Sequence, residues 1–229
     1  STDGGDFQLW LDDTTLTEAV YPGQDGHTYA FYSVAYDYAG NLEDAPTVPD
    51  AITTTPDQEP PAVIAMEIND GAPQRSKLYN ISMEFSKPVT IAAGALSLHN
   101  DNTGQTPDIS AVLFNEATGA WDFSGMVIPD GYYTATLSAA MVQDASGNPL
   151  AEDYEFTLHV LKGDTDGDRE IGSGDYTLLL SQFGQSGTGL AADFNDDGRV
   201  DMADFVVLRS SYGKIVALPA APEVVSVEI

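Results

Sequence analysis

Apolar and polar residues alternate along short stretches of the chain up to residue 162, and clusters of Gly, Pro, Asn and Asp separate these stretches. In the first part the alternation covers residues 7–11 and 28–38, and a period of two is typical of β-strands. Gly40 and Asn41 tolerate positive φ, so a hairpin turn is expected after the second run. A ligand site at Asp37 and Asn41 is the alternative.

Further alternating runs follow, again with turn residues between them. They predict strands at residues 62–68, 80–85, 111–114, 132–137 and 154–161. Short strands at this spacing indicate a β-sandwich. The proline-rich residues 53–61 are predicted to form a linker, because proline cannot donate a hydrogen bond to a central strand.

The period lengthens after residue 162, where two short helices are predicted, each closed by a glycine. The inward residues of the helix at 175–183 are predicted to be Leu178, Leu179 and Phe183. Those of the helix at 203–212 are predicted to be Phe205, Val206, Leu208 and Tyr212. The predicted fold class is therefore mainly β with a small α C-terminal part, in which β-sandwich modules precede a paired loop-helix domain.

An acidic loop comes before each predicted helix, and the two loop-helix units form a repeat. The first loop begins DTDGDREI at residue 164, and the second begins DFNDDGRV at residue 193. The differences 193 − 164, 204 − 175 and 213 − 184 are all 29, so the copies stay in register to their closing glycines.

Oxygen-bearing residues in each loop have the spacing that calcium requires. Calcium takes six to eight oxygens at about 2.3–2.6 Å, which a 12-residue loop supplies from alternate positions, one backbone carbonyl and a closing carboxylate. The predicted ligands of the first site are Asp164, Asp166, Asp168, the carbonyl of Glu170, and Asp175. Those of the second site are Asp193, Asn195, Asp197, the carbonyl of Arg199, and Asp204. We therefore predict two calcium ions.

Solvated acidic loops without metal are the alternative, and magnesium fits less well because it keeps its waters. Carboxylates about 4 Å apart repel by roughly 4 kcal/mol at an effective dielectric of 20, so metal binding and folding are expected to be one event. Arg169 stands in the first loop where Gly198 stands in the second. The first turn must therefore bend without glycine, and the first site is predicted to be the less ideal one.

The formal net charge of −28 argues against nucleic acid and anionic membrane surfaces as partners, although a salt-exposed habitat would also explain part of it. With no cysteine, the chain has neither a disulfide framework nor a thiolate site. No apolar run approaches the roughly 18 residues that a membrane helix needs, so membrane insertion is not expected.

Two β-regions resemble known families. The motif GHTYAFYSVAYDYAGNLE resembles the second half of a fibronectin type III-like module, so residues 1–57 are expected to be part of such a module. The motifs PPAVIAMEINDGA, ISMEFSKPV, IPDGYYTATL and DASGNPLAEDYEFTLHV resemble bacterial Ig-like domains of the S-layer type. That resemblance implies a sandwich over residues 58–162 that serves as a spacer or packing module.

The paired acidic loops, with an aspartate as closing ligand and no helix predicted before the first, resemble a dockerin domain over residues 163–213. The resemblance implies that partner recognition falls just before each closing ligand and on the following helix. The residues so implied are Ser173, Gly174 and Gln182 in the first repeat, and Met202, Ala203 and Arg209 in the second. Because Ser173 and Gly174 differ chemically from Met202 and Ala203, the two repeats are not expected to bind a partner equivalently.

The implied partner is a cohesin-like domain. The competing partner is the neighbouring Ig-like domain, which ends one residue before the first loop and would make calcium a stiffener of a surface rod. His99 and His159 fall on separate predicted elements, where surface or packing roles are expected. Trp10 and Trp121 are expected to be core or rim aromatics rather than a sugar platform.

No nucleophile, base and orienting residue are grouped in the sequence, so catalysis is not expected. The resemblances imply a secreted or cell-surface bacterial protein, and an accessory region of a larger secreted polysaccharide-degrading enzyme is the alternative. Residues 214–229 are expected to be a tail or the first strand of a following module, since PEVVSVEI at 222–229 parallels PAVIAMEI at 61–68. Such a strand would indicate a trimmed modular protein, or it could pair with the open edge of the first module.

Overall fold

The computed structural model describes residues 1–219, so the strand predicted at 222–229 lies outside the described residues. The chain divides into two compact units. Residues 1–60 and 146–148 form the first unit, and the second contains the rest of the chain from Pro61 onward. Each unit is described below by itself.

Within residues 1–60 the regular structure is one antiparallel pair, β1 (Thr28–Phe31) and β2 (Ala51–Thr54). Tyr29 is buried here, beneath Tyr21, whose ring also lies 5.1 Å from that of Trp10. The predicted strand at 7–11 is absent and the one at 28–38 ends at Phe31. Over the described residues, the longer run pairs with β2 up to Phe31, and beyond it forms only the isolated bridge between Tyr36 and Leu42, so its later alternation does not build a sheet face.

The predicted turn after this strand is present. Asp37 Oδ1 accepts the backbone N–H groups of Ala39 and Asn41 at 2.8 and 2.9 Å, and Gly40 has a φ of +86°. The side-chain amide of Asn41 donates to Asp37 Oδ2 at 2.7 Å. These two residues therefore hold the turn itself, which explains their pairing in the sequence.

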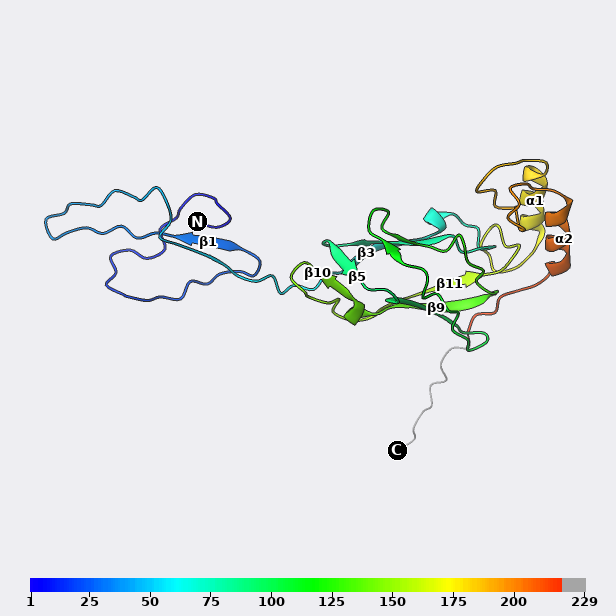
Figure 1. Cartoon of the computed structure of the whole chain (residues 1–229), viewed down its shortest axis with the longest axis horizontal. Coiled ribbons are helices and arrows are strands. Elements are labelled where there is room, and N and C mark those ends of the chain that lie inside the picture. The colour runs from blue at the N-terminus through cyan, green and yellow to red at the C-terminus, as the bar shows by residue number, and fades with distance from the viewer. Residues whose placement is uncertain (220–229) are drawn as a thin grey trace, which may run out of the picture. The chain divides into compact units, whose positions relative to one another are not determined.

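The second unit contains a sandwich of short antiparallel strands (Figure 1). Its strands are β3 (Val63–Ile68), β4 (Asn80–Phe85), β5 (Val89–Ile91), β6 (Leu96–Asn100), β7 (Phe114–Asn115), β8 (Ala120–Asp122), β9 (Gly131–Leu137), β10 (Val142–Asp144) and β11 (Tyr154–Val160). Two 3-10 turns, η1 (Asn69–Gly71) and η2 (Ala139–Met141), lie between them. The sheets have the orders β3-β4-β8-β7, β11-β9-β6 and β10-β5.

Alternate residues of the strands form the sandwich core, as the period of two predicts. In β9, Tyr133, Ala135 and Leu137 are fully buried, while the threonines between them are half-buried. Trp121 in β8 is 2 % exposed and belongs to the same core. A core role for Trp121 is thus confirmed, whereas Trp10 in the first unit is 40 % exposed and lies at a rim.

Two helices close the described chain, α1 (Ser173–Gln182) and α2 (Met202–Ser211), which lie beside each other in Figure 1. They share a second small core, separate from that of the sandwich. Its buried members are Leu161, Ile171, Leu179, Ala192, Phe194, Val200, Leu208 and Val216, and Tyr132 of β9 packs against it. Strand β9 therefore contributes to both cores.

The predicted inward faces of the helices are partly wrong. Leu179 and Leu208 are buried, but Phe183, Val206 and Tyr212 are 46 %, 58 % and 59 % exposed. Each ten-residue helix buries one side in the small shared core, and within the described residues no further layer covers its other side. Periodicity locates apolar positions on a helix but does not tell how many of them find a neighbour.

Candidate metal centre

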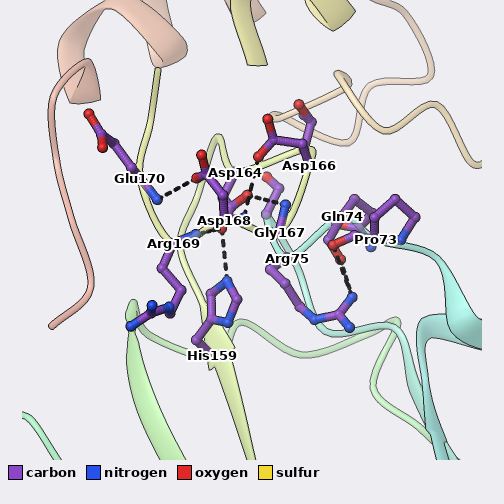
Figure 2. A network of polar contacts seen from close by, with 12 residues as sticks. Pro73, Gln74, Arg75, His159, Asp164, Asp166, Gly167, Asp168, Arg169 and Glu170 are labelled. Carbon is purple, nitrogen blue, oxygen red and sulfur yellow. Dashed lines mark hydrogen bonds and ion pairs between the residues drawn. The ribbon is translucent and has the colours of Figure 1, made fainter. Parts of the chain in front are cut away.

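Three carboxylates of the first loop converge. One carboxylate oxygen from each of Asp164, Asp166 and Asp168 can be chosen so that all three lie within 4.8 Å of one another. Figure 2 shows these residues at the turn of the loop, above the end of β11. Asp164 is completely buried, whereas Asp166 and Asp168 are exposed.

The closing aspartates link each loop to the helix that follows it. Asp175 Oδ1 accepts the backbone N–H of Thr165 at 2.6 Å, and its Oδ2 accepts that of Gly172 at 2.8 Å. A carboxylate at this third helical position satisfies an N–H group that the helix start leaves unpaired. For this reason α1 begins at Ser173, two residues before the start that the sequence predicts.

The second loop repeats this network 29 residues later. Asp204 Oδ1 accepts from Phe194 N at 2.7 Å and its Oδ2 from Asp201 N at 2.9 Å. Three further backbone-to-side-chain hydrogen bonds of the first loop recur in the second. In the first loop they run from Arg169 N to Asp164 Oδ2 at 3.0 Å, from Asp168 N to Asp166 Oδ1 at 3.3 Å, and from Glu170 N to Asp168 Oδ1 at 2.8 Å. Their counterparts in the second loop, in the same order, run from Gly198 N to Asp193 Oδ2 at 2.8 Å, from Asp197 N to Asn195 Oδ1 at 3.1 Å, and from Arg199 N to Asp197 Oδ1 at 2.9 Å. The duplication is therefore geometric as well as sequential.

The donor set suits a hard cation. Every side chain that the loops offer is a carboxylate or an amide with oxygen as its ligand atom, which is the chemistry that calcium prefers. The pKa of Asp166 is raised, first by partial desolvation of its carboxylate, although the residue as a whole is exposed, and then by the negative charges of Asp175, Asp168 and Asp164. A cation placed among these groups would remove that repulsion, so the residues present fit calcium.

The residues whose carbonyls complete the predicted ligand sets occupy matching places. Glu170 forms an isolated antiparallel bridge with Ile215, and Arg199 forms one with Ser186. Each loop is therefore held at its seventh position by a neighbouring extended segment.

The left-handed bend without glycine predicted at Arg169 is present, but the second loop contains a similar residue. Arg169 does adopt a left-handed φ of +74°, but Asp196 in the second loop has a φ of +60°. Gly167 and Gly198 occupy the two complementary positions, with φ of +79° and +82°. Each loop thus combines one glycine with one left-handed non-glycine residue, and aspartate tolerates that conformation better than arginine. Aligning Gly167 with Asp196 would have revealed the second strained position.

The residues implied to bind a partner are mostly available. Ser173, Gly174, Met202 and Ala203 are exposed at the helix starts, and Arg209 is exposed on α2. Gln182 is half-buried, and its side-chain oxygen accepts the N–H of Ala192 at 3.0 Å. It therefore braces the segment between the repeats.

Two residues beside the first loop were missed as parts of the site. His159 of β11 is buried, and its Nε2 lies 2.8 Å from Asp164 Oδ2 (Figure 2). Arg75 donates its backbone N–H to the Asp164 carbonyl at 2.9 Å. Burial lowers the pKa of the Arg75 guanidinium, with Asp164 acting in the opposite direction. The five-residue separation of His159 and Asp164 was the available signal, because a strand end and the loop after it lie close together.

Family models match the sandwich region and the helical region in turn. Residues 57–159 match a bacterial Ig-like domain, and residues 162–211 match a dockerin type I domain. The chain carries a bacterial Ig-like domain followed by a dockerin domain. Dockerin type I domains bind calcium, both families are non-catalytic assembly modules, and both are typical of extracellular or cell-surface bacterial proteins.

Two solved structures are similar to this chain over part of its length. Both are crystal structures of interface mutants of a type II cohesin–X-dockerin complex from Acetivibrio cellulolyticus, and each is 14 % identical over 53 % of this chain and 82 % of the matched chain. Their TM-scores are 0.22 and 0.23, too low to support a shared arrangement. A search of curated proteins finds no match. Over residues 1–219, no helix has the length and apolar character to cross a membrane.

Proposed function

We propose that the dockerin domain binds two calcium ions, through residues 164–175 and 193–204, and in that state holds a cohesin-like domain of another protein. The chain would then be a non-catalytic assembly segment of a secreted or cell-surface bacterial protein. The duplicated network around the closing aspartates carries this proposal, since it appears in both loops with the same donors and acceptors.

Calcium would supply the positive charge that lets these carboxylates remain close together. In the first site the oxygens of Asp164, Asp166, Asp168 and Asp175 would hold it, with the carbonyl of Glu170. In the second the oxygens of Asp193, Asn195, Asp197 and Asp204 would do so, with the carbonyl of Arg199. The chain's own contribution is to fix each loop to its helix through the closing aspartate.

The second repeat offers the better surface for a protein partner. Met202, Ala203 and Val206 form an exposed apolar row at the start of α2, while Ser173, Gly174 and Thr177 fill the equivalent positions of α1. Apolar side chains at the centre of an interface supply most of its binding energy. We therefore place the main contact with a cohesin-like partner on α2.

A hollow next to this row supports that placement. It has a volume of about 370 Å³ and is lined by Tyr176 of α1 and by Phe205, Leu208, Arg209 and Tyr212 around α2. Aromatic rings beside an arginine are the residue types most often found at binding hot spots. Arg209, implied as a partner residue by the dockerin resemblance, stands at this hollow.

The test is a titration of the full chain with isolated cohesin modules, in calcium and in excess EDTA. Binding is expected only in calcium, and Met202→Ser is expected to weaken it about tenfold, as for a contact of moderate hot-spot strength. Ser173→Ala is the matched control in the first repeat and should leave the affinity nearly unchanged. Equal losses from both variants would contradict the preference for α2.

A structural role for calcium is the second candidate, and the contacts between the two domains of the second unit favour it. Lys77 of the Ig-like domain lies 2.6 Å from Asp196, and Gly163 donates its N–H to Ser76 Oγ at 3.0 Å. Such contacts would let the calcium-loaded dockerin stiffen its junction with the Ig-like domain. This role is compatible with partner binding on α2, whose exposed row takes no part in these contacts.

A further inference from the structure

The first ligand of the first site is held from outside its own loop. Asp164 Oδ1 accepts the N–H of Gly167 at 2.6 Å, and Oδ2 accepts that of Arg169 at 3.0 Å. The third partner is His159 Nε2, 2.8 Å from Oδ2, on the last strand of the Ig-like domain. Both side chains are buried, so the contact is shielded from water.

The equivalent aspartate of the second site lacks such a partner among the contacts of the described residues. Asp193 accepts only from its own loop, with Asp197 N at 3.2 Å from Oδ1 and Gly198 N at 2.8 Å from Oδ2. The Oδ2 atoms of both first ligands accept a matched backbone N–H, and the Oδ1 atoms each accept one from within the loop, so the histidine is the one partner from outside a loop among these contacts of the described residues.

The first loop also rests directly on the Ig-like domain. Arg75 N donates to the Asp164 carbonyl at 2.9 Å, and Leu161 N donates to the Arg75 carbonyl at 2.9 Å. Gly167 lies so close to Pro73 that a Cβ at this position would overlap the Pro73 carbonyl oxygen. His159 and the segment 72–76 thus approach the loop from two sides (Figure 2).

We propose that His159 is a positioning residue of the first calcium site, so that the Ig-like domain and the dockerin domain build this site together. The inference rests on the calcium binding proposed above. A carboxylate can only accept, so His159 donates through Nε2–H, which fixes its tautomer. Asp164 is then held in one rotamer before the metal arrives, and less of the binding free energy is spent on ordering it.

The expected effect is specific to one site. Removing an outer hydrogen-bond partner of a metal ligand typically lowers metal affinity by about 10- to 100-fold. We expect a loss of about tenfold at the first site and none at the second, because His159 touches only Asp164 among the predicted ligands.

The experiment follows calcium binding to the full chain by proton-nitrogen NMR, with the amide of Gly167 reporting on the first loop and that of Gly198 on the second. His159→Leu keeps a buried side chain of similar size without a donor, and His159→Gln keeps an N–H group. We expect His159→Leu to weaken the response of Gly167 alone and His159→Gln to restore most of it. His99→Ala, at an exposed histidine of β6, is the matched control and should change neither response.

An unchanged Gly167 response in His159→Leu would reduce His159 to a packing residue and overturn the inference. So would equal weakening at both loops, or a His159→Gln variant that behaves like His159→Leu. The wild-type chain gives a further test that needs no variant, since the ring-nitrogen signal of His159 should shift at the same calcium concentrations as Gly167. A His159 signal that ignores calcium while both glycines respond would overturn the inference alone, whereas two silent glycines would overturn the proposed function as well.

Discussion

The two acidic loops repeat one sequence pattern and one hydrogen-bond pattern, yet they lie in different surroundings. The first rests on the Ig-like domain through Arg75 and His159. The second is bordered mainly by the segment between the repeats, where Val200 N donates to Gln185 O at 3.0 Å and Gly187 N to Gly198 O at 2.9 Å. A duplicated motif therefore does not imply duplicated stability, because each copy takes part of its stability from different neighbours.

Removing calcium should test this difference with the largest effect. If free calcium stands at about 100 times the dissociation constant, each ion contributes about 2.7 kcal/mol to stability, which the small core of the helices cannot replace. Excess EDTA is expected to abolish the helical circular dichroism of α1 and α2 while the β-rich signal of the Ig-like domain persists. Helicity unchanged in excess EDTA would refute the link between metal and folding.

The same titration can be resolved by residue. Since the first loop has support from the Ig-like domain, the amides around Leu208 in α2 should lose protection from hydrogen exchange at a higher calcium concentration than those around Leu179 in α1. Simultaneous loss at both helices would show that the two repeats unfold as one cooperative unit.

Replacing a glycine of each loop by alanine should also distinguish the two loops, with a smaller effect on stability. Gly167→Ala and Gly198→Ala each place alanine in a left-handed conformation, at a cost of about 1–2 kcal/mol. Only Gly167→Ala also overlaps Pro73, which should add about 1–3 kcal/mol, whereas the nearest atom to a Cβ at position 198 is 3.9 Å away. Urea unfolding in saturating calcium measures the loss of stability in each variant. Equal losses would mean that the first loop does not pack tightly against Pro73 of the Ig-like domain.

The smallest expected effect concerns the left-handed residues. Arg169→Gly should stabilise the chain by about 0.5–1 kcal/mol, since glycine accepts the φ of +74° without strain but loses more entropy on folding. Asp196→Gly should give no gain, because aspartate tolerates this conformation and its ion pair with Lys77 is lost. Thermal unfolding in calcium compares the stabilities of the two variants. A larger gain in stability from Asp196→Gly would mean that the greater backbone strain lies at Asp196 rather than at Arg169.

Local features of this chain could be predicted, and features that depend on packing could not. The strand at residues 80–85 and the two helices, each beginning within two residues of its predicted start, follow from short-range pattern and spacing. The exposure of Val206 and Tyr212 depends on a layer that the helices do not have. A strand continuing past Phe31 would need a pairing partner that alternation alone does not supply.

The contact between His159 and Asp164 shows the same limit within the candidate site. Their types and spacing are visible in the sequence, but their approach depends on how the first loop rests on the residues around Arg75. Candidate metal ligands within one loop can be proposed from spacing because they all lie on one short stretch of backbone. A supporting residue from another domain needs the three-dimensional arrangement.

The two backbone hydrogen bonds that Arg75 forms with Leu161 and Asp164 also have a mechanical consequence. Tension between the Ig-like domain and a partner held on α2 would pass along residues 161–164. There the Arg75 carbonyl accepts from Leu161 N and the Arg75 N–H donates to the Asp164 carbonyl, so both hydrogen bonds would oppose extension of this segment. The first acidic loop begins at Asp164, directly after these hydrogen bonds. Calcium bound there would resist extension at the point where force enters the dockerin domain.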